Sequence, residues 1–115
     1  MAPTRPRIEP AGDGVVLTLS GELDAYDAPT LRAAFTEAVG GLGETVLVVL
    51  DLTAVSFLDS TVLGTIVGLL KRVRERDGEL RVVLPETAAR RIFELTGLDR
   101  SLDVRPSRAA ALPRA

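Results

Sequence analysis

The hydrophobic period of the chain changes from that of a strand to that of a helix within one continuous stretch, residues 45–76. Residues 45–50 are apolar and rich in β-branched side chains, which predicts a buried strand over residues 45–52. This strand is apolar on both faces, so we expect it at the centre of a sheet. Further along, apolar residues recur at the spacing of one helix face, at Val62, Ile66, Leu69, Leu70 and Val73. The stretch therefore predicts a strand followed by a helix over residues 60–76.

Asp59 and Ser60 lie at the junction between this strand and this helix. Both residue types cap helix starts by accepting hydrogen bonds from backbone N–H groups. The first turn of a helix also carries unpaired N–H groups and the positive end of the helix dipole. The hydroxyl of Ser60 is therefore predicted at a location that suits a phosphate.

The predicted polar face of the same helix contains two glycines, Gly64 and Gly68. The other residues predicted on this face are Thr61, Thr65, Lys71, Arg72 and Glu75. A glycine inside a helix costs roughly 0.8–1 kcal/mol relative to alanine, so the pair needs a reason. The positions could merely tolerate glycine, or glycine could allow the close approach of another element of the same domain. Alternatively, the two glycines form a smooth surface for the backbone of a partner. We favour the partner surface as the hypothesis.

The rest of the chain alternates strands and helices. The predicted strands cover residues 7–9, 15–20, 80–84 and 102–104, with a turn at residues 12–14. We expect residues 21–24 to leave the second strand, and a helix to follow Asp27 and end at residues 40–41. The third helix is predicted from Pro85 to Thr96, with Gly97 as its left-handed stop and Leu98 packed back on Phe93.

This alternation predicts one α/β domain over residues 1–104, with a small mixed β-sheet and three main helices. Residues 1–6 are expected to be a frayed arm, and residues 105–115 a tail without regular structure. The start lacks the apolar core of a signal peptide, and no window approaches a membrane span, which predicts a cytoplasmic protein.

Composition excludes most catalytic chemistry. The chain has no cysteine and no histidine, which removes thiolate nucleophiles, imidazole bases and the usual zinc ligands. Ser60 beside Asp59 suggests a nucleophile, but Lys71, the only lysine, lies about 16 Å further along the helix, too far to act as its base. No phosphate-binding glycine loop occurs, and we expect no cofactor.

Charge gives little support for a nucleic-acid or metal site. A net charge of −2 argues against a broad nucleic-acid surface, and we interpret the basic residues at the end of the second helix as solvated. Asp24, Asp51 and Asp59 could meet at strand ends and bind a cation, although capping or solvated surface is the favoured interpretation for each alone.

Residues 57–68, Phe-Leu-Asp-Ser-Thr-Val-Leu-Gly-Thr-Ile-Val-Gly, resemble the signature of the STAS domain, in particular the bacterial anti-sigma-factor antagonists. In that family the strand-to-helix turn carries a phosphorylatable serine. Residues 21–24, Gly-Glu-Leu-Asp, resemble the turn that lies beside this serine, and residues 91–98 resemble the last helix and its exit. The likeness extends from Val15 to Val104 with the three motifs in the expected order.

The resemblance implies a regulatory binding module rather than an enzyme. Ser60 would be the phosphoacceptor, and the partner surface would comprise Asp24, Asp59, Ser60, Thr61, Val62, Gly64, Thr65 and Gly68. The implied partners are an anti-sigma factor with serine kinase activity, which would bind the unphosphorylated form, and a serine phosphatase. Val62 departs from the family pattern, which usually has glycine there. Its branched side chain would either obstruct the partner or be buried against the sheet.

Two other interpretations stay open on the sequence. The chain could be a non-switching STAS subunit of a stress-signalling scaffold or lipid-transport complex, in which Ser60 is only a helix cap. A small hydrolase using Ser60 and Asp59 has the least support. Loss of partner binding on phosphorylation would distinguish a phosphorylation-switched antagonist from the non-switching subunit. A reactive-serine probe that fails to label Ser60 would argue against the hydrolase.

Overall fold

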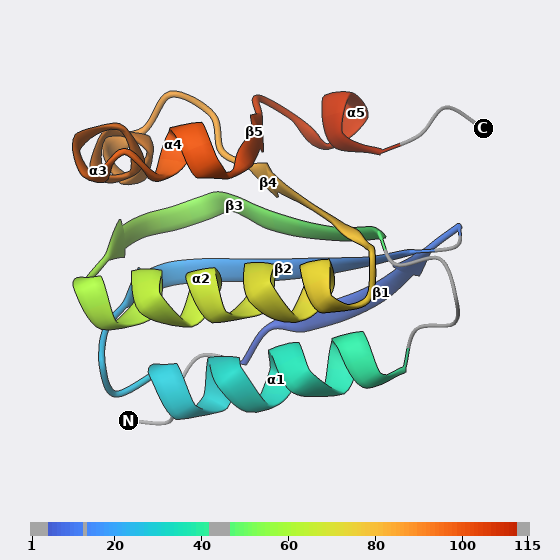
Figure 1. Ribbon diagram of the computed structural model, residues 1–115. Helices are drawn as coiled ribbons and strands as arrows, with labels where there is room; N and C mark the ends of the chain where they lie inside the picture. Colours follow the sequence, from blue (N-terminus) through green and yellow to red (C-terminus); the bar gives the residue numbers. More distant parts are fainter. Residues whose placement is uncertain (1–4, 13, 42–46, 113–115) are drawn as a thin grey trace.

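A five-stranded sheet forms the centre of the computed structural model, which describes residues 5–12, 14–41 and 47–112. Its strands lie side by side in chain order: β1 (Arg7–Ala11), β2 (Gly14–Leu23), β3 (Leu47–Leu58), β4 (Glu79–Val83) and β5 (Asp103–Arg105). β1 is antiparallel to β2, and the other neighbours are parallel (Figure 1). The predicted mixed sheet and the central place of its most apolar strand are confirmed.

Three main helices and two single-turn helices accompany the sheet within the described ranges. They are α1 (Ala28–Gly40), α2 (Ser60–Glu75), α3 (Ala88–Thr96), α4 (Leu98–Ser101) and α5 (Arg108–Ala111). α1 and α2 pack against each other along one face of the sheet, whereas α5 lies over the opposite face at the end of β4 (Figure 1). The three main helices were predicted; α4 and α5 were not.

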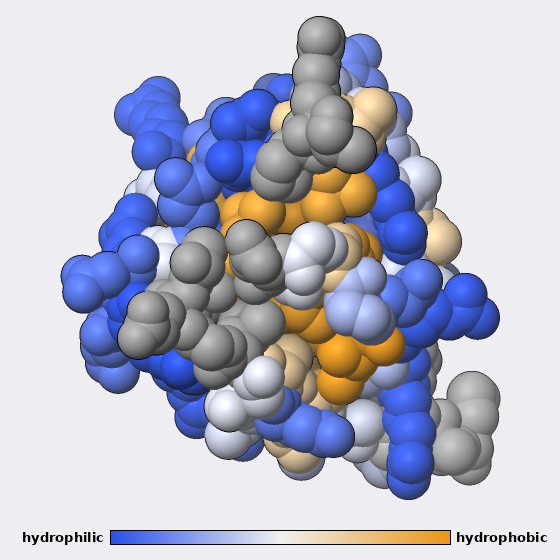
Figure 2. Space-filling model, turned by 90° about the vertical axis from the view of Figure 1, so that its right-hand side faces the viewer, coloured by the Kyte–Doolittle hydropathy of each residue, from blue (hydrophilic) through white to orange (hydrophobic). Residues whose placement is uncertain are grey.

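The two faces of the sheet bury different residues because side chains alternate along a strand. Val15, Leu17 and Leu19 of β2 face the main core beneath α1 and α2. Val16 points the other way and joins a smaller cluster with Val49, Val83 and Ala111 of α5. Figure 2 views the molecule from the right-hand side of Figure 1 and shows apolar surface at the centre of this side, surrounded by hydrophilic residues.

β2 and β3 are both longer than predicted, and each extends toward α2. β3 continues past residue 52 to Leu58, and β2 continues through residues 21–23, which were expected to leave the strand. The two strands stay paired up to Leu23 and Leu58, with register shifts along the way. Gly21 has a φ of 83° beside one of these shifts, a conformation that glycine adopts without the penalty of a Cβ atom.

The C-terminal third differs most from the prediction. α3 begins at Ala88 rather than Pro85, because Thr87 provides the cap: its Oγ1 accepts a hydrogen bond from the Arg90 N–H at 3.5 Å. Gly97 ends α3 with a φ of 76°, as predicted, and α4 starts immediately after it. Leu98 is partly buried against the core cluster that includes Phe93.

The expected unstructured tail is corrected for residues 105–112. Arg105 ends β5, and residues 108–111 form α5, whose Ser107 cap accepts a hydrogen bond from the Ala110 N–H at 3.2 Å. This segment is ordered because its residues contact the second face of the sheet. Residues 113–115 of the expected tail and residues 1–4 of the expected arm lie outside the described residues. No helix in the described ranges has the length and apolar character needed to cross a bilayer.

Candidate functional site

Asp59 fixes the start of α2 by hydrogen bonds both to the helix and to β2. The Asp59 carboxylate accepts a hydrogen bond from the Val62 N–H at 3.0 Å, and the Asp59 carbonyl accepts one from the Leu63 N–H at 3.1 Å. Asp59 therefore caps the helix, as predicted. Its own N–H donates to the Leu23 carbonyl at 3.2 Å, which ties the helix start to the end of β2.

Ser60 is the first residue of α2 and is exposed. It lies outside both the core and the strands, in the first turn, where helix N–H groups lack partners within the helix. Thr61, the next residue, is also exposed. The structure thus presents a hydroxyl to solvent at the positive end of a 16-residue helix.

The pairing of Leu23 with Leu58 brings the turn after β2 to the same end of the sheet as Ser60. Within this turn, the Asp24 carboxylate accepts a hydrogen bond from the Tyr26 N–H at 2.9 Å. The Asp24 N–H donates to the Asp27 carboxylate at 3.1 Å. Asp27 precedes α1 as predicted, but its side chain accepts from the turn and makes no capping hydrogen bond to the helix.

Two exposed aromatic side chains near this end of the sheet were missed as site candidates. Tyr26 is 63% exposed in the turn after β2, and Phe57 is 46% exposed two residues before the Asp59 cap. Large exposed aromatic residues are enriched among the residues that dominate binding at protein interfaces. Burial does not alternate strictly over residues 53–58 of β3, so no period in the sequence marks Phe57 as exposed.

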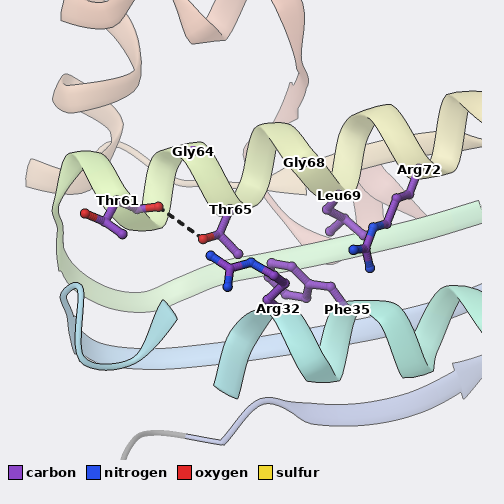
Figure 3. A pocket seen from close by; sticks show the side chains of 8 residues that line it. All are labelled: Arg32, Phe35, Thr61, Gly64, Thr65, Gly68, Leu69 and Arg72. Atoms are coloured by element: carbon purple, nitrogen blue, oxygen red, sulfur yellow. Dashed lines mark hydrogen bonds between the residues drawn. The ribbon is translucent and has the colours of Figure 1, made fainter. Parts of the chain in front are cut away.

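A groove between α1 and α2, here called the α1–α2 groove, begins one residue after Ser60 and has a volume of about 280 Å³ (Figure 3). Its α1 wall consists of Arg32 and Phe35. Its α2 wall consists of Thr61, Gly64, Thr65, Gly68, Leu69 and Arg72. Most of the predicted small-residue face of α2 is therefore one wall of a groove.

Two residues predicted on the partner surface are buried instead. Val62 is fully buried in the main core, so its side chain cannot contact a partner at the surface. Thr65 is only 8% exposed, because α1 packs beside α2 on that side, and its hydroxyl donates to the Thr61 carbonyl at 3.1 Å. The burial of Val62 answers the question raised by its departure from the family pattern: the side chain fills the core.

Gly64 and Gly68 face open space. A Cβ atom built on either residue has no neighbour within 4 Å among the residues that the structure describes, apart from its own chain neighbours and helix backbone. Close approach of another described element of this domain therefore does not explain either glycine. Two hypotheses remain: glycine is merely tolerated at these positions, or the positions form a partner surface.

The third acid of the predicted cation cluster points elsewhere. Asp51 lies on the second face of the sheet, where its carboxylate accepts hydrogen bonds from Arg108 Nε at 2.5 Å and from the Thr53 hydroxyl at 2.5 Å. Arg108 also donates to the hydroxyl of Thr18, the neighbour of Asp51 on β2. The acids considered for a cation thus separate into a helix cap, a turn and an ion pair. Within the described ranges, no group of three acidic, histidine or cysteine residues could hold a metal ion.

Comparison with known proteins agrees with this geometry. A family model for the STAS domain matches residues 1–111. This chain belongs to the STAS domain family.

Relatives of this STAS domain include the anti-sigma-B factor antagonist of Listeria monocytogenes, which is 37% identical over 81% of this chain and 80% of its own. The protein of the same name from Bacillus subtilis is 31% identical over 78% of this chain and 80% of its own. Both similarities cover most of the two proteins compared, so the likeness extends well beyond the serine motif.

Solved STAS structures have the same arrangement of elements. The crystal structure of an anti-sigma factor antagonist from Mycobacterium paratuberculosis matches with a TM-score of 0.83 and 30% identity, over 94% of this chain and 90% of that one. The Bacillus cell fate determinant SpoIIAA, in its phosphorylated form, matches with a TM-score of 0.64 and 25% identity, over 91% of this chain and 95% of that one.

Proposed function

We propose that this STAS domain is an anti-sigma-factor antagonist that is switched at Ser60. In its unmodified form it binds an anti-sigma factor and so frees a sigma factor for transcription. The names of the relatives support the class of partner. The phosphorylated form of a structural neighbour supports the kind of switch.

The exposed hydroxyl of Ser60 carries the proposal. Because Asp59 caps α2 with its own carboxylate, Ser60 is not needed for that capping bond and its side chain stays open to modification. The partner kinase would transfer the γ-phosphoryl group of ATP to the Ser60 oxygen, with loss of the hydroxyl proton, and a serine phosphatase would remove it by hydrolysis. In this scheme the chain is the substrate of both enzymes and performs no catalysis.

Charge explains why phosphorylation would alter binding and leave the fold intact. A phosphoserine adds about −1.5 to −2 charges at neutral pH. At roughly 6 Å from the Asp59 carboxylate in near-aqueous surroundings, the repulsion is about 1–2 kcal/mol. The helix N-terminus offsets about 0.3–1 kcal/mol of this. Burial of the same unpaired dianion against a partner would cost several kcal/mol, so the penalty falls on the complex.

The test is a pull-down from the native cell with wild type, Ser60→Ala and Ser60→Asp, followed by intact mass of the bound and unbound pools. We expect wild type and Ser60→Ala to retain the same anti-sigma factor, Ser60→Asp to lose it, and the unbound wild-type pool to be heavier by one phosphoryl group. Equal retention by all three variants would contradict the switch.

The same experiment separates the proposal from a non-switching scaffold role. A scaffold subunit would retain its partners with Ser60→Asp as well as with wild type, because Ser60 would then lie outside the contact. Titration of the purified partner with each variant converts the comparison into affinities, for which the switch predicts a loss of at least tenfold in Ser60→Asp.

A further inference from the structure

We infer that the α1–α2 groove binds an acidic, extended segment of the partner. The inference rests on the proposed function only for the identity of the partner, the anti-sigma factor. The chemistry of the segment comes from the residues that line the groove: carboxylates would pair with its two arginines.

The charge of the groove is opposite to that of the whole chain. Arg32 on α1 and Arg72 on α2 line it from opposite walls, and none of the described residues that line it carries a carboxylate. Neither arginine forms an ion pair with any residue that the structure describes. The chain carries a net charge of −2, so a positive groove is a local feature that favours an acidic ligand.

The positions of the two arginines suit bridging between the walls. Figure 3 shows the Arg32 side chain extending from α1 toward Thr65, and the Arg72 side chain extending from α2 toward α1. The Arg72 guanidinium donates a hydrogen bond to the Thr36 hydroxyl of α1, which holds it at the groove. Each guanidinium has further N–H donors for a carboxylate of the ligand.

The open edge of the groove suits a narrow chain. Phe35 and Leu69 lie at the bottom of the groove and are each only 1% exposed, whereas Gly64 and Gly68 leave two positions of the α2 wall without a side chain. From Thr61 to Arg72 the groove follows α2 for about 16 Å, the length of about five extended residues. A short extended segment of this length could place a carboxylate near each of the two arginines.

An acidic segment in the groove also explains how phosphorylation of Ser60 would weaken partner binding. Thr61 lines the end of the groove that adjoins Ser60, so a phosphate on Ser60 would lie close to an acidic segment seated there. Like charges across an interface oppose binding. The segment would therefore be attracted by the arginines and repelled by the phosphate.

The first test uses the full chain labelled with ¹⁵N and a designed probe, acetyl-Glu-Leu-Glu-Leu-Glu-amide, with acetyl-Gln-Leu-Gln-Leu-Gln-amide as its neutral control. We expect the acidic peptide to give saturable shifts at the Gly64 and Gly68 amides and the neutral peptide to bind at least tenfold more weakly. Arg32→Glu should weaken binding at least tenfold, and Arg91→Glu, an exposed charge reversal on α3, less than twofold. Equal binding of both peptides, unchanged binding by Arg32→Glu, or shifts confined to other surfaces would overturn the inference.

The second test keeps the inference and the proposed function apart. The anti-sigma factor identified by pull-down is titrated with wild type, Arg32→Glu, Arg91→Glu and Ser60→Asp. A tenfold loss confined to Arg32→Glu and Ser60→Asp supports both. Full affinity of Arg32→Glu with loss in Ser60→Asp overturns the groove and leaves the switch. Full affinity of Ser60→Asp with loss in Arg32→Glu leaves the groove and overturns the switch. Unchanged dispersion of the amide spectrum verifies that each variant is folded.

Discussion

Arg108 lies against Asp51 although 57 positions separate the two residues in the chain. Arg108 Nε donates to the Asp51 carboxylate at 2.5 Å, and the same guanidinium donates to the Thr18 hydroxyl at 2.6 Å. The Asp51 side chain is 7% exposed, whereas that of Arg108 is 42% exposed. Together with the Thr18 contact, the pair connects the C-terminal α5 to the central strand β3 and its neighbour β2.

Removal of Arg108 is expected to destabilise the fold. Arg108→Gln leaves the buried Asp51 carboxylate without its charged partner, which should lower the free energy of unfolding by about 1–3 kcal/mol. We expect a value near the lower end of this range because Arg108 is partly exposed. Urea unfolding at pH 7 measures the loss. In a double-mutant cycle, Asp51→Asn with Arg108→Gln should cost less than the sum of the single changes, and strict additivity would contradict the pair.

Stability should depend on pH through the same carboxylate. Burial raises the pKa of the Asp51 carboxyl group, but the hydrogen bonds from Arg108 and Thr53 outweigh it, and the pKa is lower than its ordinary value. A pKa lowered by folding contributes stability above the unfolded value of about 3.9, and this contribution is lost as the pH falls below it. Wild type should therefore lose more stability between pH 6 and pH 3 than Asp51→Asn.

Thermal unfolding over that pH range checks this prediction, with Asp99→Asn, an exposed substitution near the C-terminus, as the control. The difference between wild type and Asp51→Asn should narrow toward pH 3, and the control should follow wild type. A constant difference across the range would show that the charge of Asp51 does not contribute.

The glycines of α2 should be unfavourable for stability and favourable for binding. Gly64→Ala and Gly68→Ala should each raise the free energy of unfolding by up to about 0.8–1 kcal/mol, because an added methyl group meets no described residue within 4 Å beyond its own helix turn. Each should also weaken binding of the anti-sigma factor at least fivefold. Gly40→Ala, at the end of α1 with the same open surroundings, is the matched control and should leave affinity unchanged. Stabilised variants with full affinity would mean that glycine is merely tolerated there.

Val62 should matter for the fold and not for the partner. Val62→Ala removes buried methyl groups at a fully buried position, which should cost about 2–3 kcal/mol. Val62→Gly restores the residue usual in the family and should cost about 1 kcal/mol more, because glycine is a poor helix former. Calorimetry gives the stability of each variant, and titration at a temperature where all are folded should give affinities within twofold of wild type. Improved affinity of Val62→Gly would show that valine obstructs the partner.

Local signals explain which elements could be predicted. The period of α2 and the cap at Asp59 are encoded within a few residues of each other, and both were predicted. The extension of β3 to Leu58 depends on pairing with β2, and its exposed residues, such as Ser56, conceal it in the sequence. α5 was missed because its order comes from Asp51 on a distant strand, which no local pattern of Pro, Ala and Arg reveals.

In the candidate site, too, some features follow from local sequence signals and others depend on tertiary packing. The position of Ser60 follows from the strand-to-helix junction and could be predicted. The burial of Thr65 could not, because a helical wheel for α2 alone does not include α1 packed beside it. The groove and its arginines likewise exist only once the two helices meet, and Arg32 carries no signal within its own helix.

The hydrogen bond from the Asp59 N–H to the Leu23 carbonyl has a consequence for how such a switch can evolve. It fastens the start of α2 to an interior strand, so a phosphate on Ser60 would be presented to a partner without a hinge or a moving lid. Substitutions of the residues that line the groove can then change which partner binds, while the fold stays the same. Paralogues of this domain in one genome could then avoid binding each other's partners through a few surface substitutions.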